Sequence, residues 1–361
     1  MRRFLAALAL IPLLAGAAFP VAHRERAPFA SRPALDRELW RFSGHLVARG
    51  NRRFDFSVLF FRFRVARPNA GRIDAASRWS AADIYPAAAS VVDENRAHVW
   101  SDRRIERGAL ALAAASSQRL DVHVDDWHAT GDAAADNGLD ISFHGRIDGI
   151  VLAVRARARK PGLQLAATGR ARSAPGCGGA GESVVTSLEA SGSIGAGGAP
   201  LPVSGVSWLD HEYGDRFLCA GESGWDRFWV QLDDHREILI ERVRSRKKAA
   251  VTTIAVLIDP SGIPRTLAAS TYALFNDGGA HWRSRHTGAL YPCLWGLTIP
   301  DAGLRLSLEP VTSDQELASS GVGASFWEGA LDVYDVTPGT PGRRLGSAYA
   351  ELTGYAEQPA L

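Results

Sequence analysis

Cysteine is scarce in this sequence of 361 residues. Only Cys177, Cys219 and Cys293 occur, and an odd number leaves at least one thiol without an intramolecular partner. The chain is therefore not a small domain held together by disulfides, and no pair has the C-x-x-C spacing of a structural metal site. If one bridge forms, we expect Cys219 to pair with Cys293, because Cys177 lies in a glycine-rich stretch.

An excess of charge of one sign is also lacking. The 41 basic residues nearly balance the 39 acidic ones, which leaves a formal net charge of +2. Proteins that bind nucleic acid concentrate positive charge on one face or segment, so no nucleic-acid partner is expected. Disorder is excluded as well, because 46% hydrophobic residues are enough to bury a core.

Long apolar runs are confined to the N-terminus. Arg2 and Arg3 precede an apolar run from Phe4 to Phe19, which is typical of a secretory signal peptide. We assign residues 1–22 to this signal peptide and 23–34 to a linker, with an uncleaved anchor as the alternative. No later stretch has the roughly 20 apolar residues of a membrane helix, and no cysteine follows the leader for lipid attachment. We therefore expect an exported protein, periplasmic or secreted.

The rest of the chain has the pattern of β-strands. Residues 53–64 alternate in side-chain character, and further short runs are separated by Gly, Pro, Asn and Asp, which is typical of an all-β sandwich or barrel. The one candidate helix is the alanine-rich stretch 75–89, although it contains Pro86. Because the length exceeds what one core usually holds, we predict two β units, at 35–220 and 221–357.

Several familiar motifs of catalysis and cofactor binding are missing. Residues 175–182 and 192–202 are glycine-rich, but they lack the Lys and Ser/Thr of a phosphate-binding loop, so we predict hairpin connections there. There is no G-x-S-x-G nucleophile elbow, and the H-x-H and H-x-x-x-H metal spacings are absent. We expect neither a metal nor a cofactor.

The segment with the most potential catalytic side chains is residues 208–213, Trp-Leu-Asp-His-Glu-Tyr. Asp210, His211 and Glu212 combine a proton shuttle that titrates near neutrality with two carboxylates, so they are the candidate catalytic residues. In a strand, Trp208, Asp210 and Glu212 share one face, while His211 and Tyr213 share the other. Asp210 and His211 therefore meet in one pocket only if a bulge or turn breaks the strand. A structural role, as buried polar groups that tie the two units together, is the open alternative.

Aromatic residues are abundant, with ten Trp against one Met. Large rings beside isolated acids can form the walls of a site for an apolar ligand, and a carboxyl group against an indole can act as a proton donor because its pKa is raised. Packing of the same rings in barrel ends is the alternative. The candidate substrate-binding residues are Trp208, Tyr213, Trp225, Asp226, Trp295, Trp327 and Glu328.

Eight short motifs also occur in a fixed order. They lie at residues 43–46, 59–62, 206–214, 224–234, 291–295, 314–317, 327–330 and 351–355. Together they resemble the carotenoid 1,2-hydratase-like (CrtC/AttH-like) family of predicted secreted hydrolases, over about residues 35–357. The resemblance implies two consecutive lipocalin-like antiparallel β-barrel domains, and members with known activities include carotenoid hydratases and related pericyclases. The family's His-x-Trp pair matches His211 and Tyr213, and its Tyr-x-Asp pair falls near residues 240–242, where Glu241 is the available acid.

These observations lead to a functional hypothesis. We expect an exported, cofactor-independent hydratase, hydrolase or isomerase that acts on an apolar, lipid-like or isoprenoid molecule near the junction of the two units. In this scheme Asp210 or Glu212 is the acid, and His211 is the base or orients it. The alternative is a carrier of lipophilic ligands that works beside a membrane transporter.

Overall fold

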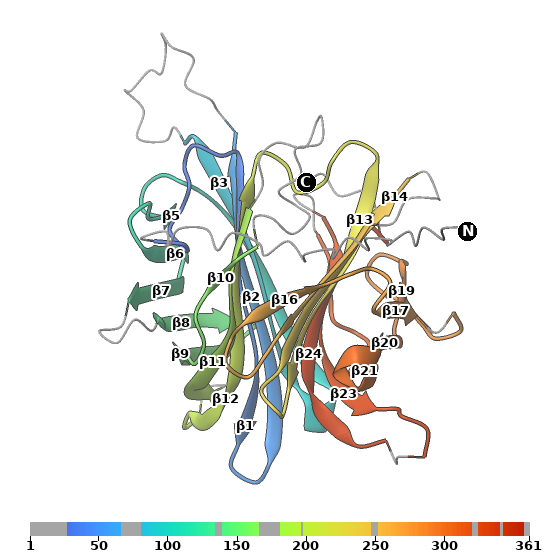
Figure 1. The fold of residues 1–361 in the computed structure, drawn as a ribbon. Helices are drawn as coiled ribbons and strands as arrows, with labels where there is room; N and C mark the ends of the chain where they lie inside the picture. The colour runs from blue at the N-terminus through green and yellow to red at the C-terminus, as the bar shows by residue number, and fades with distance from the viewer. Residues whose placement is uncertain are drawn as a thin grey trace, which may run out of the picture.

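A computed structural model describes residues 27–65, 81–133, 139–165, 181–195, 198–246, 252–276, 278–319, 324–339 and 342–356. These residues form two antiparallel β units that pack against each other (Figure 1). The first unit is a twelve-stranded sheet, and the second is a ten-stranded sheet with a separate two-stranded hairpin. The all-β, two-unit fold predicted from the sequence is confirmed.

The first sheet has the strand order β4-β3-β2-β1-β12-β11-β9-β8-β7-β6-β5, with β10 beside β11. It curls into a nearly closed barrel, because β3 and β4 contact β5, β6 and β8 from its other end. Its strands are β1 (Arg37–Ala48), β2 (Arg52–Arg64), β3 (Asp83–Asp93), β4 (His98–Arg107), β5 (Ala113–Ala115), β6 (Leu120–Val124), β7 (Trp127–Ala133), β8 (Leu139–Ile147), β9 (Ile150–Ala158), β10 (Leu163–Gln164), β11 (Gly181–Gly195) and β12 (Leu201–Gly214).

The second sheet has the order β16-β15-β14-β13-β24-β23-β21-β20-β17, with β22 beside β23, while β18 and β19 form the hairpin. Its part of the chain contains β13 (Glu222–Leu232), β14 (Glu237–Ser245), β15 (Thr252–Ile258), β16 (Pro264–Leu267), β17 (Ala273–Asn276), β18 (His281–Arg283), β19 (Leu290–Pro292), β20 (Trp295–Ile299), β21 (Leu304–Pro310), β22 (Glu316–Leu317), β23 (Phe326–Asp335) and β24 (Arg344–Thr353). Residues 215–221 connect the two sheets and contain the predicted boundary.

The two units meet along an interface that we call the seam, between β1, β2, β3, β11 and β12 of the first unit and β13, β14, β22, β23 and β24 of the second. Alternation along β1 directs Trp40 and Phe42 into the first barrel, where they join its core, and directs Leu39 and Arg41 into the seam. Strands that are buried on both faces read as nearly continuous buried runs, which is the pattern observed in β1.

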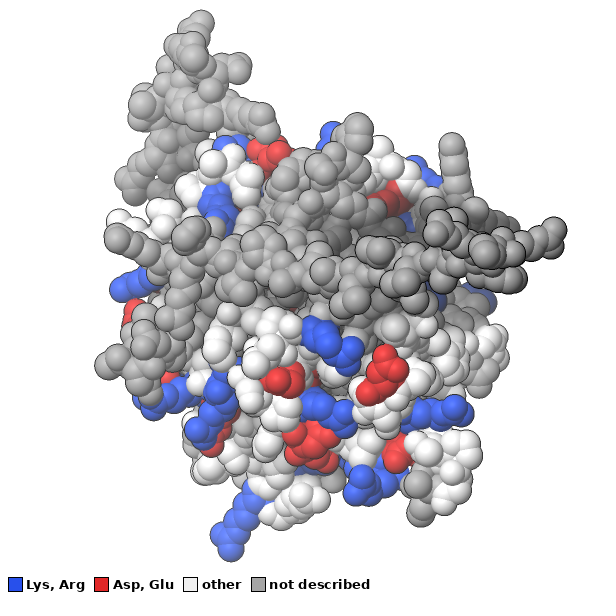
Figure 2. All heavy atoms as spheres, in the orientation of Figure 1, with Lys and Arg blue, Asp and Glu red and all other residues white. Residues whose placement is uncertain are grey.

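Polar contacts also tie the two units together. Lys160 of the first unit donates to Glu237 Oε2 at 2.5 Å and to the carbonyl oxygens of His235 and Asp259 at 2.6 and 2.8 Å. Arg53 of β2 adds a bidentate ion pair with Asp332 of β23. On the visible face of the molecule, basic and acidic side chains are interspersed (Figure 2).

The segment before β1 lies against the first barrel, and we call residues 27–36 the strap. Phe29 is buried in the barrel core, and the Trp40 indole donates to the Phe29 carbonyl at 2.9 Å. The strap overlaps the predicted linker, whereas the predicted signal peptide lies outside the described residues. Within the described part of the chain, no helix is long and apolar enough to cross a membrane.

The alanine-rich stretch is not helical where it is described. Its residues 83–89 belong to β3, while 75–80 lie outside the described residues. Strand β3 is buried on both faces, with Ala87 and Ala89 in the barrel core and Ala88 in the seam. The small side chains suit this position between two packed layers. The pairing of β2 with β3 skips Pro86, which has no N–H to donate.

The predicted pairing of Cys219 with Cys293 is wrong. Cys219 is disulfide-bonded, while Cys293 is a free thiol, and Cys177 lies outside the described residues. Cys293 follows the β18–β19 hairpin in the second unit, where its thiol lies 3.6 Å from the Tyr291 carbonyl oxygen. Cys219 lies in the connection between the two sheets.

Candidate functional site

The predicted catalytic residues lie on β12, which runs without a break through all of them. In its register with β1, His211 lies opposite Trp40 and Asp210 opposite Arg41. Asp210 and Glu212 therefore face the seam, while His211 faces the first barrel, where it stacks on Trp40 with ring centroids 4.7 Å apart. The predicted alternation is observed, and it separates Asp210 from His211.

A group of buried charges fills the middle of the seam, and we call it the seam cluster. Two arginines form its centre, Arg41 on β1 and Arg227 on β13, and both are fully buried. Six carboxylates from both units surround them: Glu182, Asp210, Glu212, Glu241, Glu328 and Glu351.

Arg41 links the two units through four of these carboxylates. Its Nη1 lies 2.8 Å from Asp210 Oδ2 and 3.5 Å from Glu212 Oε1 in the first unit. Its Nε lies 3.3 Å from Glu328 Oε1, and its Nη2 binds Glu351, both in the second unit. The ring of Trp229 lies 4.4 Å from the guanidinium carbon, so aromatic and carboxylate contacts together hold this cation in place.

Arg227 occupies the space between the acids of the first unit. Its Nη1 binds Glu212 and lies 3.7 Å from Glu182 and 3.9 Å from Asp210, and its Nε donates to Glu241 at 2.9 Å. Oxygen atoms of Glu182, Asp210 and Glu212 lie within 4.8 Å of one another, a spacing that could hold a metal ion. Here a guanidinium takes the position that such a cation would occupy.

The seam cluster has more acids than cations. If all six carboxylates were ionised, the two arginines would leave four negative charges in a closed interface. Burial raises the pKa of Asp210 to about 7, that of Glu182 to about 8 and that of Glu328 to about 7, because it disfavours the charged form; neighbouring carboxylates add to the effect and the arginines oppose it. The cluster therefore holds protons near neutral pH.

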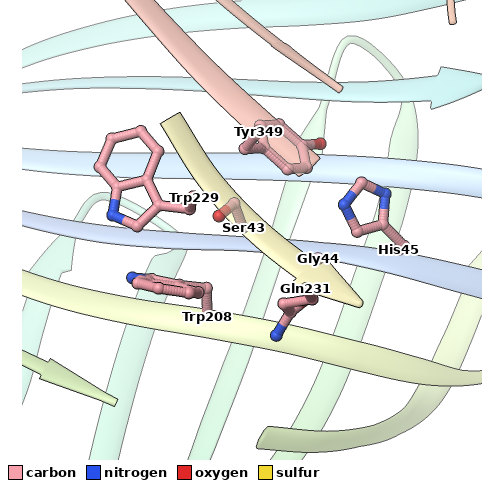
Figure 3. A pocket seen from close by; sticks show the side chains of 7 residues that line it. All are labelled: Ser43, Gly44, His45, Trp208, Trp229, Gln231 and Tyr349. Atoms are coloured by element: carbon pink, nitrogen blue, oxygen red, sulfur yellow. The ribbon is translucent and has the colours of Figure 1, made fainter. Parts of the chain in front are cut away.

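A narrow hollow lies beside the seam cluster (Figure 3). Its walls are formed by Ser43, Gly44, His45, Trp208, Trp229, Gln231 and Tyr349, with the two indoles at one end and His45 and Tyr349 at the other. It is too narrow to admit a water molecule in this arrangement.

Four polar atoms on the walls of the hollow make no hydrogen bond within the described chain. They are the two indole nitrogens, the Tyr349 hydroxyl and the Ser43 hydroxyl. A buried polar group without a partner costs about 1–3 kcal/mol. The closed seam therefore leaves several groups unsatisfied.

A histidine–aspartate pair lies at one end of the hollow. His45 Nδ1 is 2.7 Å from Asp55 Oδ1, across the β1–β2 pairing. Burial lowers the pKa of His45 to about 3 and raises that of Asp55 to about 7, so burial favours a neutral pair over an ion pair. This pair was not among the residues predicted for the site.

His211 and Tyr213 are placed on the other side of β12, under the strap. His211 Nδ1 lies 3.1 Å from the Pro28 carbonyl oxygen, and its Nε2 lies 3.3 Å from Glu38 Oε1. Tyr213 is half-buried, and the Arg32 guanidinium lies over its ring. These two residues contact the strap and not the seam cluster.

The remaining predicted residues lie in two further environments. Trp225 packs in an apolar part of the seam. Asp226 lies on the other face of β13, where it accepts hydrogen bonds from Arg242 at 2.9 Å and Tyr355 at 2.8 Å. Trp295 and Trp327 are in the core of the second unit. Of the predicted site residues, the seam brings together Trp208, Asp210, Glu212, Trp225 and Glu328.

Sequence reasoning missed both arginines of the seam cluster and two of its six acids, Glu182 and Glu351, and it reached Glu241 only through the family resemblance. The signal available was a charge at a buried position of a strand: Arg227 stands between Trp225 and Trp229 on the same face of β13. Glu182 belongs to β11, although it falls in a glycine-rich stretch predicted to be a loop. Their partners come from strands far apart in the sequence, such as Arg41 and Glu351, which are 310 residues apart.

Comparison with known proteins gives a family and a fold. A family model described as AttH-like matches residues 21–355, and no curated protein matches the sequence. A crystal structure described as an AttH from Nitrosomonas europaea has 24% sequence identity and a TM-score of 0.76, with 97% of this chain and 100% of that chain covered.

Two other crystal structures are similar at lower identity. Kievitone hydratase from Nectria haematococca has 16% identity and a TM-score of 0.66 over 94% of this chain and 95% of that one. CghA with Sch210972 has 15% identity and a TM-score of 0.51, over 88% and 89%. At these identities the likeness shows a shared tandem lipocalin-like fold.

Proposed function

The chain belongs to the AttH-like family, and from this membership we propose that it is a hydratase- or hydrolase-like enzyme whose acid–base chemistry takes place in the seam. The fold that it shares with kievitone hydratase, a protein named for a hydration, supports this class of reaction. The observation that carries the proposal is the excess of buried carboxylates over arginines, since a carboxyl group that keeps its proton near neutral pH is a competent general acid.

Asp210 and Glu328 are the proposed acids. Each carries one oxygen, Asp210 Oδ1 or Glu328 Oε2, that makes no hydrogen bond within the described chain, and that oxygen is the natural site of the proton. In a hydration, the carboxyl proton would pass to one carbon of a double bond and the oxygen of a water molecule would bond to the other. The water would then return one proton to the carboxylate, so that the acid is regenerated.

The proposed substrate is an apolar, lipid-like or isoprenoid molecule bound along the hollow. Trp208 and Trp229 would contact its apolar part, and the unsatisfied hydroxyl and indole groups would bind its polar atoms or the reacting water. Because the hollow is narrow, binding requires the two sheets to move apart. We also propose export, on the basis of the N-terminal leader.

The test begins with whatever molecule the full chain retains on purification. The ligand is extracted, identified by mass spectrometry and incubated with fresh protein in water enriched in ¹⁸O, and one ¹⁸O atom in the product reports hydration or hydrolysis. We expect turnover by the wild type and a loss of about 100-fold or more in Asp210→Asn and Glu328→Gln. Asp140→Asn, at an exposed position, is the matched control and should keep wild-type activity.

A second outcome would reject the proposal. If the wild type returns its ligand unchanged, and Asp210→Asn binds that ligand equally well, the protein carries an apolar molecule without converting it. Carriage beside a membrane transporter would then be the function to pursue.

A further inference from the structure

The strap is attached to the first barrel by a group of hydrogen bonds that lies outside the seam. Besides the bond from Trp40 to the Phe29 carbonyl, the Ser31 amide donates to the Ser116 carbonyl at 2.8 Å. Arg62 Nη2 donates to the carbonyl oxygens of Leu35 at 2.7 Å and Arg32 at 3.2 Å. With Phe29 in the barrel core, these bonds hold the strap against the first barrel.

Glu38 is the anchor of this arrangement, and both of its oxygens are occupied. They accept hydrogen bonds from the Ser31 hydroxyl at 2.7 Å, the Arg32 amide, Arg62 Nε and His211 Nε2. Burial opposes ionisation of Glu38, but His211 and then Arg62 outweigh it and lower its pKa to about 2. Glu38 is therefore an ionised acceptor throughout the range of pH in which the protein is handled.

His211 faces an acceptor at each ring nitrogen. The Pro28 carbonyl oxygen near Nδ1 and the Glu38 carboxylate near Nε2 carry no proton, so both ring nitrogens must donate if both bonds are to form. A neutral imidazole has one N–H and can satisfy only one of them. The fully bonded arrangement is that of the imidazolium form.

Several other groups surround His211, and Glu38 is the one that favours a positive charge on the ring. On β1 it faces Glu38 and the ring of Trp40, on β12 Tyr213, and on β11 the residue opposite is Ser183. Two cations lie further away and act against a charge on the ring: Arg62, which is paired with Glu38 and Asp83, and Arg32 of the strap, which lies over Tyr213.

We infer that protonation of His211 fastens the strap to the first barrel and that loss of this proton loosens it. The strap is then closed at lower pH and opens as pH rises, because the neutral ring leaves either the Pro28 carbonyl or Glu38 without its donor. Opening would uncover Trp40, Tyr213 and the place in the barrel core that Phe29 fills. The inference does not depend on the proposed function, since it concerns the opposite face of β12.

Amide hydrogen exchange of the full chain tests this inference. Exchange is followed at Ser31 and Arg32, with the indole N–H of Trp40 observed by NMR, at about pH 6 and about pH 9, on either side of the range in which histidine usually titrates. After correction for intrinsic exchange rates, we expect protection in the strap to fall by about tenfold or more at the higher pH. Strand β9 of the same barrel is the internal reference for any fall in global stability, and protection in the strap should fall by more than protection in β9 does.

Two variants distinguish an effect of His211 on the strap from a general effect of pH on the protein. His211→Gln supplies only an amide donor on one side, so the strap should exchange fast at both pH values. His45→Gln, at a histidine that makes no contact with the strap in the described structure, should keep the wild-type change. Equal protection of the wild-type strap at both pH values, an equal loss in β9, or a wild-type pH response in His211→Gln would overturn the inference. If His211→Gln does not fold, the pH dependence of exchange at the Trp40 indole N–H in the wild type, compared with that of β9, decides.

Discussion

Buried carboxylates lie on both faces of the same pair of strands, β1 and β12, with Glu38 on the strap side and Asp210 and Glu212 on the seam side. Under the strap, Glu38 receives four hydrogen bonds and is held ionised. In the seam, Asp210 has an oxygen without a donor and the raised pKa of a group that keeps its proton. The two sites are about equally buried, so the number of donors and the local charge balance decide the protonation state.

The largest effect should come from removing a cation of the seam cluster. Arg41→Leu leaves Asp210, Glu328 and Glu351 buried without their shared partner, and we expect the free energy of unfolding to fall by about 3–5 kcal/mol. Urea denaturation measures it. Arg119→Leu is the control, because Arg119 forms an exposed ion pair with Asp121, and its effect should stay within about 0.5 kcal/mol. A loss below about 1 kcal/mol for Arg41→Leu would contradict the picture of a closed, charged seam.

The next largest effect should come from Glu38→Gln under the strap. An amide presents one acceptor oxygen in place of two, so it leaves donors of Ser31, Arg62 or His211 without a partner. We expect a loss of about 2–3 kcal/mol in the free energy of unfolding. Glu189→Gln, at an exposed ion pair, should change it little. Equal effects of the two substitutions would mean that the four bonds to Glu38 do not stabilise the fold.

The pH dependence of the free energy of unfolding should report the protonation of the seam carboxylates. Asp210, Glu182 and Glu328 have pKa values of about 7 to 8 in the folded chain, above those of unfolded carboxylates. Their contribution to stability is present below pH of about 4 and is lost as pH rises through 7 to 8, so the free energy of unfolding should fall between about pH 6 and pH 8. Glu38 acts in the opposite sense, since its contribution is lost as pH falls toward about 2.

Thermal unfolding at constant ionic strength measures this balance. We expect the melting temperature to be higher near pH 5 than near pH 8. A melting temperature that rises over this range would show that the seam carboxylates are ionised in the folded protein.

The smallest effect should come from Asp210→Asn, the same chemical change as Glu38→Gln. It replaces a carboxyl group that keeps its proton with a neutral amide of the same shape, and Arg41 keeps Glu328 and Glu351 as partners. We expect a change within about 1 kcal/mol in the free energy of unfolding near neutral pH, together with a weaker dependence on pH. A loss as large as that of Glu38→Gln would show that Asp210 is an ionised structural carboxylate, and the contrast between the two faces would fail.

Sequence reasoning predicted the fold and the face of the strand on which each residue of β12 lies. It did not predict which residues of other strands cover each face. Alternation is a local property, so it correctly placed Asp210 and Glu212 on one side and His211 on the other. Which residues contact each face of β12 depends on pairing and packing between strands that are far apart in the sequence. Asp210 lies opposite Arg41 across β1, and Arg227 reaches it from the other sheet. The tryptophans at 225 and 229 indicated that Arg227 could be buried. No residue near Pro28 indicated that the predicted linker would contact His211.

The enclosure of Lys160 has a practical consequence for observing the two units in solution. The sequence has only three lysines, and Lys247 and Lys248 lie outside the described residues. The Lys160 amine is surrounded by Glu237 and two carbonyl oxygens of the second unit. An amine-acylating reagent can reach the Lys160 amine only when the two units separate there. The rate of acylation at Lys160 therefore measures how often they separate.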